Sequence, residues 1–150
     1  MAAVVFLQQA GRPTSKRSTV MSVCSLETLQ AIRLKVVEAA PDAFVVINRA
    51  QEVVDCNEEA EFLFGYGRGD LIGKRLGQLI PEEAREAHLK HVGKFYRSPR
   101  RREMGVTGMT LEGLNRDGER FPVRIRLAPI VIEGPEGGVF GLAIVRRTDT

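Results

Sequence analysis

Apolar side chains recur at helical spacing along two stretches of the sequence. The first stretch follows Ser25, a residue type that favours the N-cap of a helix, and it ends before Pro41. Proline cannot continue a helix, so the pattern predicts an amphipathic helix over residues 25–40. Its apolar residues form one broad stripe, which would pack on the rest of the chain or on a second copy.

The second helical stretch follows Pro81, whose missing N–H costs nothing in a first helical turn, and it continues to about Arg97. Residues one turn apart would give this helix an apolar face of Ala84, His88, Val92 and Phe95, with Leu89 and Tyr96 beside them. The imidazole of His88 would then lie near the middle of the face, and that of His91 at its edge.

Runs rich in apolar and β-branched residues predict two short strands before this helix, Ala43–Asn48 and Glu52–Asp55. Asn57 then suits the N-cap of a short helix that would end at Gly65. Four glycines within residues 67–77 indicate turns and irregular backbone rather than another long helix.

Three further strands are predicted after the long helix. A basic loop would end at Glu103, and the Gly- and Thr-rich segment Met104–Leu114 would form a strand. Asp117-Gly118 is a strong signal for a hairpin turn. Apolar residues alternate along the return strand, so that one face would contain Phe121, Val123, Ile125 and Leu127. The segment Val139–Val145 would be the last strand.

This order of elements indicates an α+β fold, in which an antiparallel sheet is covered on one face by helices. A chain of 150 residues corresponds to one domain. We expect a disordered leader over residues 1–24, the amphipathic helix over 25–40 and a folded domain over 41–147. The native start stays open between Met1 and Met21.

The net charge of +3 comes from the first 25 residues, which hold three basic residues and no acid. The other 19 basic residues balance the 19 acidic ones, which gives no electrostatic footprint for nucleic acid. One local basic run consists of Arg97, Arg100, Arg101 and Arg102. Two interpretations of this run stay open: a solvated loop, or a contact with an anionic ligand or an acidic partner.

No apolar run approaches the ~20 residues that a membrane-spanning helix needs. The two cysteines, Cys24 and Cys56, give neither a disulfide framework nor a CxxC pair. We therefore expect a reduced, cytoplasmic setting without membrane contact. The sequence offers no paired carboxylates in apolar surroundings and no Ser or Cys with a His at interpretable spacing, so we expect no enzymatic activity.

Three blocks of residues resemble the PAS domain family, and the resemblance covers about residues 26–147. The blocks are Asn57-Glu58-Glu59-Ala60 through Leu63-Phe64-Gly65-Tyr66, then Asp70-Leu71-Ile72-Gly73-Lys74, then Arg116-Asp117-Gly118 followed by Phe121-Pro122-Val123. The resemblance implies a five-stranded antiparallel sheet with short helices and one longer helix on one face. It also implies a sensory or interaction module rather than a catalyst.

A narrower resemblance is to the haem-binding PAS domains of bacterial oxygen sensors. Those domains carry a His seven residues after the Pro that begins the long helix, as His88 follows Pro81 here. The resemblance implies that His88 is the proximal ligand of a haem iron, which is an ordinary role for neutral imidazole. It further implies a cofactor pocket of Val92, Phe95, Met109, Ile125 and Leu127, with the basic loop near the haem propionates.

One departure from that subgroup concerns Met109. Oxygen-sensing members carry an Arg on the first hairpin strand, and the same count back from the turn gives Met109 here. The difference argues against stable O₂ binding of that type, although a Met can serve as a second axial ligand. The alternative for His88 is a core or partly exposed residue that ligates nothing.

Three functions therefore stay open: a sensory module with an unidentified ligand, a haem-based gas or redox sensor, and a ligand-free dimerisation module. The sequence ends at Thr150 without an output domain, so we expect a homodimer and a signalling partner, unless the chain is a fragment. The contact surfaces would be the helix over residues 26–40 and the sheet face that bears Arg124 and Arg126.

Overall fold

The computed structural model describes residues 24–104 and 110–149, in two compact units that divide after Ala39. In the first unit, helix α3 (Leu26–Ala39) confirms the predicted helix. Ser25 is its N-cap, since its Oγ accepts a hydrogen bond of 3.1 Å from the Thr28 N–H. None of the α3 residues is buried. The expected disorder of the leader falls on residues outside the described part and stays a prediction.

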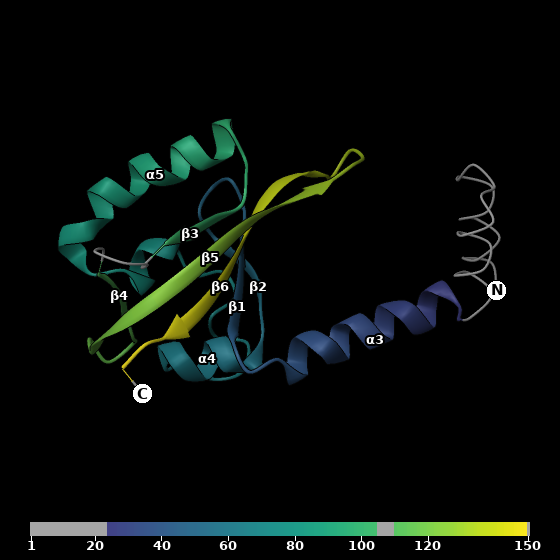
Figure 1. Cartoon of the computed structure of the whole chain (residues 1–150), viewed down its shortest axis with the longest axis horizontal. Helices are drawn as coiled ribbons and strands as arrows, with labels where there is room; N and C mark the ends of the chain where they lie inside the picture. Colours follow the sequence, from purple (N-terminus) through teal and green to yellow (C-terminus); the bar gives the residue numbers. More distant parts are fainter. Residues whose placement is uncertain (1–23, 105–109, 150) are drawn as a thin grey trace. The chain divides into compact units, whose positions relative to one another are not determined.

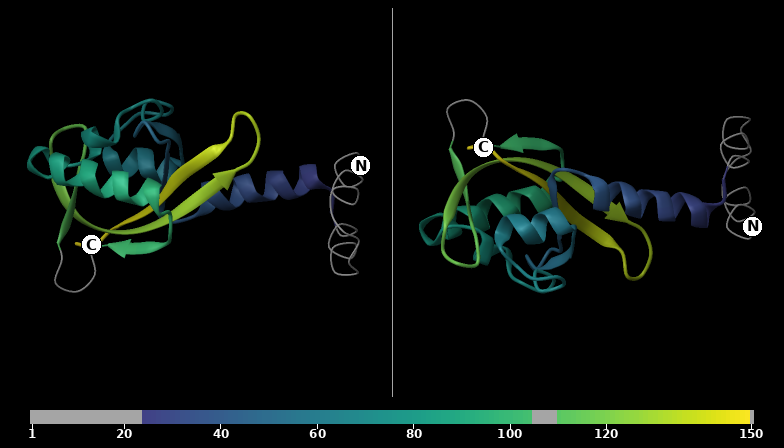
Figure 2. Two further views of the ribbon diagram at one scale, coloured as in Figure 1. Left: turned by 90° about the horizontal axis from the view of Figure 1, so that it is seen from above. Right: turned by 90° about the horizontal axis from the view of Figure 1, so that it is seen from below.

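The second unit is an antiparallel sheet with helices on one face, which confirms the predicted α+β fold (Figures 1 and 2). The strands run in the order β2-β1-β6-β5, with β3 and β4 both paired to β5. The strands are β1 (Ala43–Ile47), β2 (Val53–Cys56), β3 (Arg102–Met104), β4 (Leu111–Leu114), β5 (Arg120–Ile132) and β6 (Gly138–Arg147). The helices are α4 (Glu58–Phe64) and α5 (Arg85–Arg97), with 3₁₀ turns η1 (Leu76–Leu79) and η2 (Glu82–Ala84).

The strand predicted over Met104–Leu114 is instead two strands, β3 and β4, on either side of residues 105–109. Both strands lie along the same edge of β5, because β6 occupies the opposite edge over Val123–Ile132. The five predicted sheet positions are therefore filled, one of them by two short strands in succession. The strand also begins earlier than predicted, since Arg102 and Glu103 pair with β5 and are not part of a loop.

The start of α4 is tied to the first strand by Asn57, which is 3% exposed. Its side-chain oxygen accepts hydrogen bonds from the Ala60 N–H at 3.1 Å, as an N-cap does, and from the Phe44 N–H at 2.8 Å. Its amide nitrogen donates to the Asp42 carbonyl at 2.9 Å. Gly65 ends the helix in the left-handed region, with φ 75°. The predicted cap and stop of α4 are thus confirmed.

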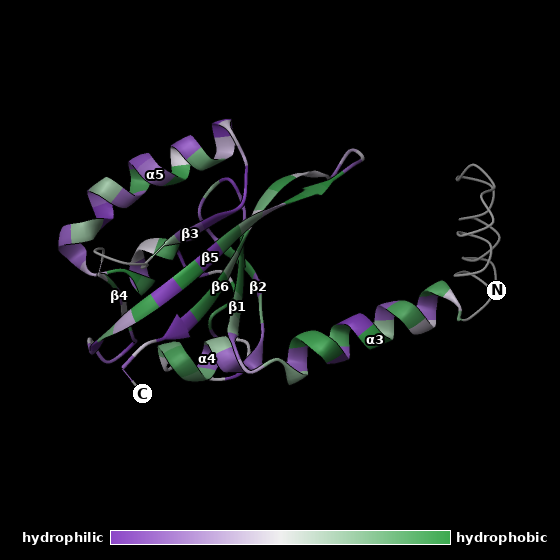
Figure 3. Cartoon of the chain, in the orientation of Figure 1, coloured by the Kyte–Doolittle hydropathy of each residue, from purple (hydrophilic) through white to green (hydrophobic). Residues whose placement is uncertain are grey.

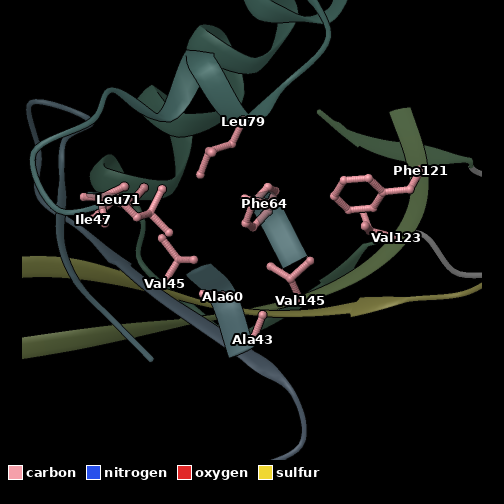
Figure 4. Packing of buried hydrophobic residues seen from close by; sticks show 11 residues of the cluster. Ala43, Val45, Ile47, Ala60, Phe64, Leu71, Leu79, Phe121, Val123 and Val145 are labelled. Atoms are coloured by element: carbon pink, nitrogen blue, oxygen red, sulfur yellow. The ribbon is translucent and has the colours of Figure 1, made fainter. Parts of the chain in front are cut away.

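The main hydrophobic core lies between the sheet and α4 (Figure 4). Its buried residues are Ala43, Val45, Ile47, Val53, Ala60, Phe64, Leu71, Leu79, Phe121, Val123 and Val145. The rings of Phe64 and Phe121 lie 5.7 Å apart between centroids. A Cβ on Gly113 of β4 would come within 2.9 Å of the Phe121 ring, so only glycine fits this position as the ring now lies.

Helix α5 packs on the sheet through a second, smaller cluster of Val92, Phe95 and Tyr96. The Tyr96 hydroxyl shares its one proton between two carbonyl oxygens, that of Ile47 at the end of β1 at 2.9 Å and that of Asn48 just after it at 2.8 Å. Burial raises the pKa of this hydroxyl, partly offset by the backbone amide of Gly141 and by Arg49. The predicted helix after Pro81 thus exists, although its first turn is the 3₁₀ turn η2.

Candidate functional site

The sheet-facing side of α5 is buried only in its C-terminal half. Val92 and Phe95 are buried there, whereas His88, one turn before Val92 on the same face, is half-buried. Ala84 is exposed and Leu89 is 53% exposed, so neither belongs to the packed face as predicted. Close packing of α5 on the sheet is therefore found in its C-terminal half.

The imidazole of His88 is the titratable group on this face. Burial lowers its pKa below the ordinary value of 6.5, and the neighbouring His91 lowers the pKa further. Among the described residues no hydrogen bond engages the His88 ring. The ring is therefore neutral at physiological pH with its nitrogens available, which is the state that ligates a metal ion. His91 is exposed.

Strand β5 presents Ile125 and Leu127 to the helices. They share the parity of the buried residues Phe121 and Val123, Ile125 packs on the main core, and Leu127 packs on the α5 cluster. Both are only half-buried although they lie on the inner face of a central strand. The inner face of the sheet is thus incompletely covered between the two clusters.

Strand β3 adds two side chains to this inner face: Arg102, which the sequence analysis placed in the basic loop near the haem propionates, and Met104, which it placed in a strand. Arg102 lies opposite Leu127 and Met104 lies opposite Ile125, and directly opposed residues project to the same side of a sheet. The Nε of Arg102 is buried and has no hydrogen-bond partner among the described residues. A buried unpaired guanidinium nitrogen is costly, which makes Arg102 a place where an anionic group would be stabilised.

The sequence analysis grouped Arg102 with three other arginines in a basic loop, for which a contact with an anionic ligand stayed open, and it missed that Arg102 lies in a strand. Counting the strand parity back from Met104 assigns Arg102 inward and Glu103 outward, and the Glu103 carboxylate accepts hydrogen bonds from Arg126 on the outer face. Met109, the other residue expected here, lies outside the described residues.

Together these residues suit a ligand with an apolar body and an anionic end. His88 and Val92 would contact it from the helix, Ile125 and Leu127 from β5, and Arg102 from β3. Haem has this chemistry: a flat apolar body, two propionates and an iron atom that imidazole ligates. The residues present therefore fit that cofactor.

Other chemistry is not supported at described positions. No group of three or more His, Cys, Asp and Glu residues gathers there as a metal site would require. Burial raises the pKa of the Cys56 thiol to about 11, so this cysteine is protonated at neutral pH. No described helix is both long enough and apolar enough to span a bilayer.

A family model described as PAS domain matches residues 41–146. Among sequence relatives, the oxygen sensor protein DosP of Escherichia coli is 33% identical over 102 residues, which are 68% of this chain and 12% of that protein. The sensor protein FixL of Bradyrhizobium diazoefficiens is 26% identical over 103 residues, 69% of this chain and 20% of that protein. The chain thus spans a fifth or less of these relatives.

Solved structures give the same fold. The PAS domain of an HTR-like protein from Haloarcula marismortui has a TM-score of 0.67 at 20% identity, covering 82% of this chain and 94% of that chain. A PAS domain from Colwellia psychrerythraea has a TM-score of 0.67 at 22% identity, covering 80% and 97%. At such identities the likeness concerns the fold alone.

Proposed function

The chain belongs to the PAS domain family, and from this premise we propose that it is a sensory module that binds a small ligand between α5 and the sheet. PAS domains act in signal transduction as sensors. The observation that carries the proposal is the half-buried inner face at Ile125 and Leu127, because a fully packed core would cover the middle of a central strand. Within this proposal the protein is a cytoplasmic regulator and not an enzyme.

We propose haem as the ligand class to test first. His88 would hold the iron, since its imidazole is neutral and unengaged by described residues. Arg102 would stabilise a propionate, because its Nε is buried and lacks a partner among the same residues. Bound haem would supply gas or redox sensitivity. Support also comes from the relative named as an oxygen sensor.

The test is an absorption spectrum of the full chain before and after addition of haemin. We expect a Soret band that His88→Ala abolishes and His91→Ala retains, because the second imidazole lies on the same helix but is exposed. Arg102→Leu is expected to weaken haem retention and leave the position of the band unchanged. Melting temperatures of the haem-free variants would show whether each one folds.

Each outcome has one meaning. A band that survives in His88→Ala would refute His88 as the ligand even if haem binds. If the folded wild-type chain gives no band, haem is excluded. The broader sensor proposal would then be tested by mass spectrometry of the small molecules released when the purified protein is denatured. That proposal fails if the protein releases no small molecule.

A ligand-free dimerisation module is the second candidate, and α3 supports it. Ile32 and Val36 lie one turn apart on the same face of this helix and are 49% and 61% exposed. A second copy would cover them and carry a signal between protomers. Sedimentation equilibrium at rising concentration tests this: we expect a dimer that Val36→Glu dissociates, and a monomer at every concentration would refute it.

A further inference from the structure

Three exposed basic side chains lie on one face of α5, and two more exposed ones follow in the loop after the helix. We call these five residues the basic strip: Lys90, Lys94, Arg97, Arg100 and Arg101. In α5 its members are four and then three residues apart, which places them on one face. That face points away from the sheet, because the buried residues of α5 lie on the opposite side. The polar segments of α5 are visible in Figure 3.

No residue of the basic strip takes part in an ion pair with a described residue. Elsewhere arginines do find acids: Arg116 lies beside Asp70, Arg120 beside Glu83, Arg126 beside Glu103, Arg146 beside Asp42 and Arg147 beside Asp149. Within residues 85–104 the acids are Glu86, at the start of α5, and Glu103, which already pairs with Arg126.

The helix dipole stabilises only two of the five positive charges in the basic strip. Lys94 and Arg97 lie in the last turn of α5, where the helix dipole favours positive charge. Lys90 lies a turn earlier, and Arg100 and Arg101 lie beyond the helix, so the dipole does not favour them. Glu86 lies one turn before Lys90 on the same face and offsets part of this charge, but like charges one turn apart repel each other, so the spacing of Lys90, Lys94 and Arg97 is a cost to the isolated domain.

We propose that the basic strip is a docking site for an acidic segment of a partner protein. This proposal is independent of the ligand between α5 and the sheet, because the strip lies on the opposite face of the helix. An acidic segment would remove the repulsion within the strip and would be attracted to it at long range. From Lys90 to Arg97 the strip is about 10 Å long at 1.5 Å per residue, which suits a short peptide.

Charge and composition argue for protein over the other polyanions. The chain from residue 26 onward is neutral overall, so there is no broad field of the kind that holds nucleic acid. The aromatic residues of α5, Phe95 and Tyr96, are buried and offer no stacking surface to bases. Because these residues are buried, the apolar face of α5 is not available for insertion into a membrane surface.

The experiment measures fluorescence anisotropy of a labelled peptide of alternating glutamate and alanine with the full chain at low and high salt. The same peptide with glutamine in place of glutamate is the neutral probe. The strip variant is Lys90→Gln with Lys94→Gln and Arg97→Gln. The matched control removes the same charge at exposed positions outside the basic strip and outside the proposed dimer surfaces, where no ion pair with a described residue is found: Arg68→Gln with Lys74→Gln and Arg75→Gln.

We expect the strip variant to raise the dissociation constant about tenfold, as three surface charge contacts do together, and the control to change it less than about twofold. Salt should weaken wild-type binding, and the neutral peptide should not bind. Equal losses in strip variant and control would overturn the proposal. The proposal would also be overturned if the wild-type chain bound an oligothymidylate of equal charge, or vesicles containing phosphatidylserine, more tightly than the glutamate peptide.

Two further measurements keep the outcome decisive. If the triple strip variant fails to fold, Arg100→Gln with Arg101→Gln tests the same site outside the helix, and no loss of peptide binding would refute the proposal. Sedimentation of the chain alone shows whether a second copy occupies the strip. If the chain self-associates and the strip variant abolishes this association, the basic strip binds a second copy of this chain, and the proposal of a separate partner protein is refuted.

Discussion

Gly141→Ala tests how tightly α5 is held against the sheet. Gly141 lies on β6 under the two aromatic rings at the C-terminal end of α5. A Cβ at this position would lie 3.2 Å from Cγ1 of Ile47, 3.3 Å from Cε1 of Phe95 and 3.5 Å from the Tyr96 hydroxyl oxygen. The first two distances are shorter than ordinary carbon contacts, so the helix or the side chains must move.

The magnitude follows from two opposing effects. Overpacking a core by one methyl group costs about 1–3 kcal/mol, while the loss of glycine's freedom in the unfolded chain returns about 0.4–1 kcal/mol. The expected net loss is about 1–2 kcal/mol of unfolding free energy. For a domain of this size that lowers the melting temperature by about 3–6 °C. Urea unfolding followed by far-ultraviolet circular dichroism measures the free energy, and a thermal scan measures the shift.

Gly93→Ala is the matched control, because the same methyl group is added on α5 itself. A Cβ at Gly93 has nothing within 4 Å, and alanine favours a helix interior over glycine by about 0.5–1 kcal/mol. The two substitutions should therefore change stability in opposite directions. A Gly141→Ala variant as stable as wild type, beside a stabilised Gly93→Ala, would show that α5 does not press on β6 as described.

Three further changes test the contacts around the site. Asn57→Ala should cost about 2–4 kcal/mol in urea unfolding, because three backbone groups lose their hydrogen bonds to its buried side chain; Asn57→Asp should cost less, since both accepted bonds remain. Tyr96→Phe should cost about 1–2 kcal/mol in the same assay, and an unchanged midpoint would mean that its hydroxyl bonds contribute nothing. For His88 the folded pKa is lowered, so the unfolded state binds more protons; stability should fall as the pH drops below 6.5, and His88→Gln should flatten that dependence. A wild-type pH profile identical to that of His88→Gln would refute the burial of this imidazole.

Elements with a strong local signal were predicted from the sequence. Asn57 and Gly65 bound α4 because an N-cap oxygen and a left-handed C-cap are local requirements that few residue types meet. The turn at Gly118 has φ 87°, as its Asp-Gly pair indicated, and the alternation along β5 follows from one buried face. Local chemistry was sufficient for each of these.

The site depended on information that local patterns lack. Four arginines in six residues suggest a solvated loop, yet Arg102 alone turns inward because β3 pairs with β5 and its parity follows from that register. The sequence also did not show how far the packing extends along α5. Ala84 and Leu89 have the spacing of the apolar face, but both are exposed in the structure. Pairing between segments far apart in sequence decides both features.

The two ends of α5 are attached to the sheet by interactions of different strength, and this bears on where a ligand would act. At the C-terminal end, buried rings pack on the sheet, and the Tyr96 hydroxyl shares its proton between the carbonyls of Ile47, the last residue of β1, and Asn48. At the N-terminal end, the Arg85 Nε donates to the carbonyls of Gly77 at 2.8 Å and Ile80 at 3.2 Å, which lie before the helix and not in the sheet. The link to the sheet there is the exposed ion pair of Glu83 with Arg120 of β5, which contributes little. His88 lies toward this end, so a ligand bound there would act on the half of α5 that has no buried residue, while the buried aromatic contacts at the other end keep the fold intact.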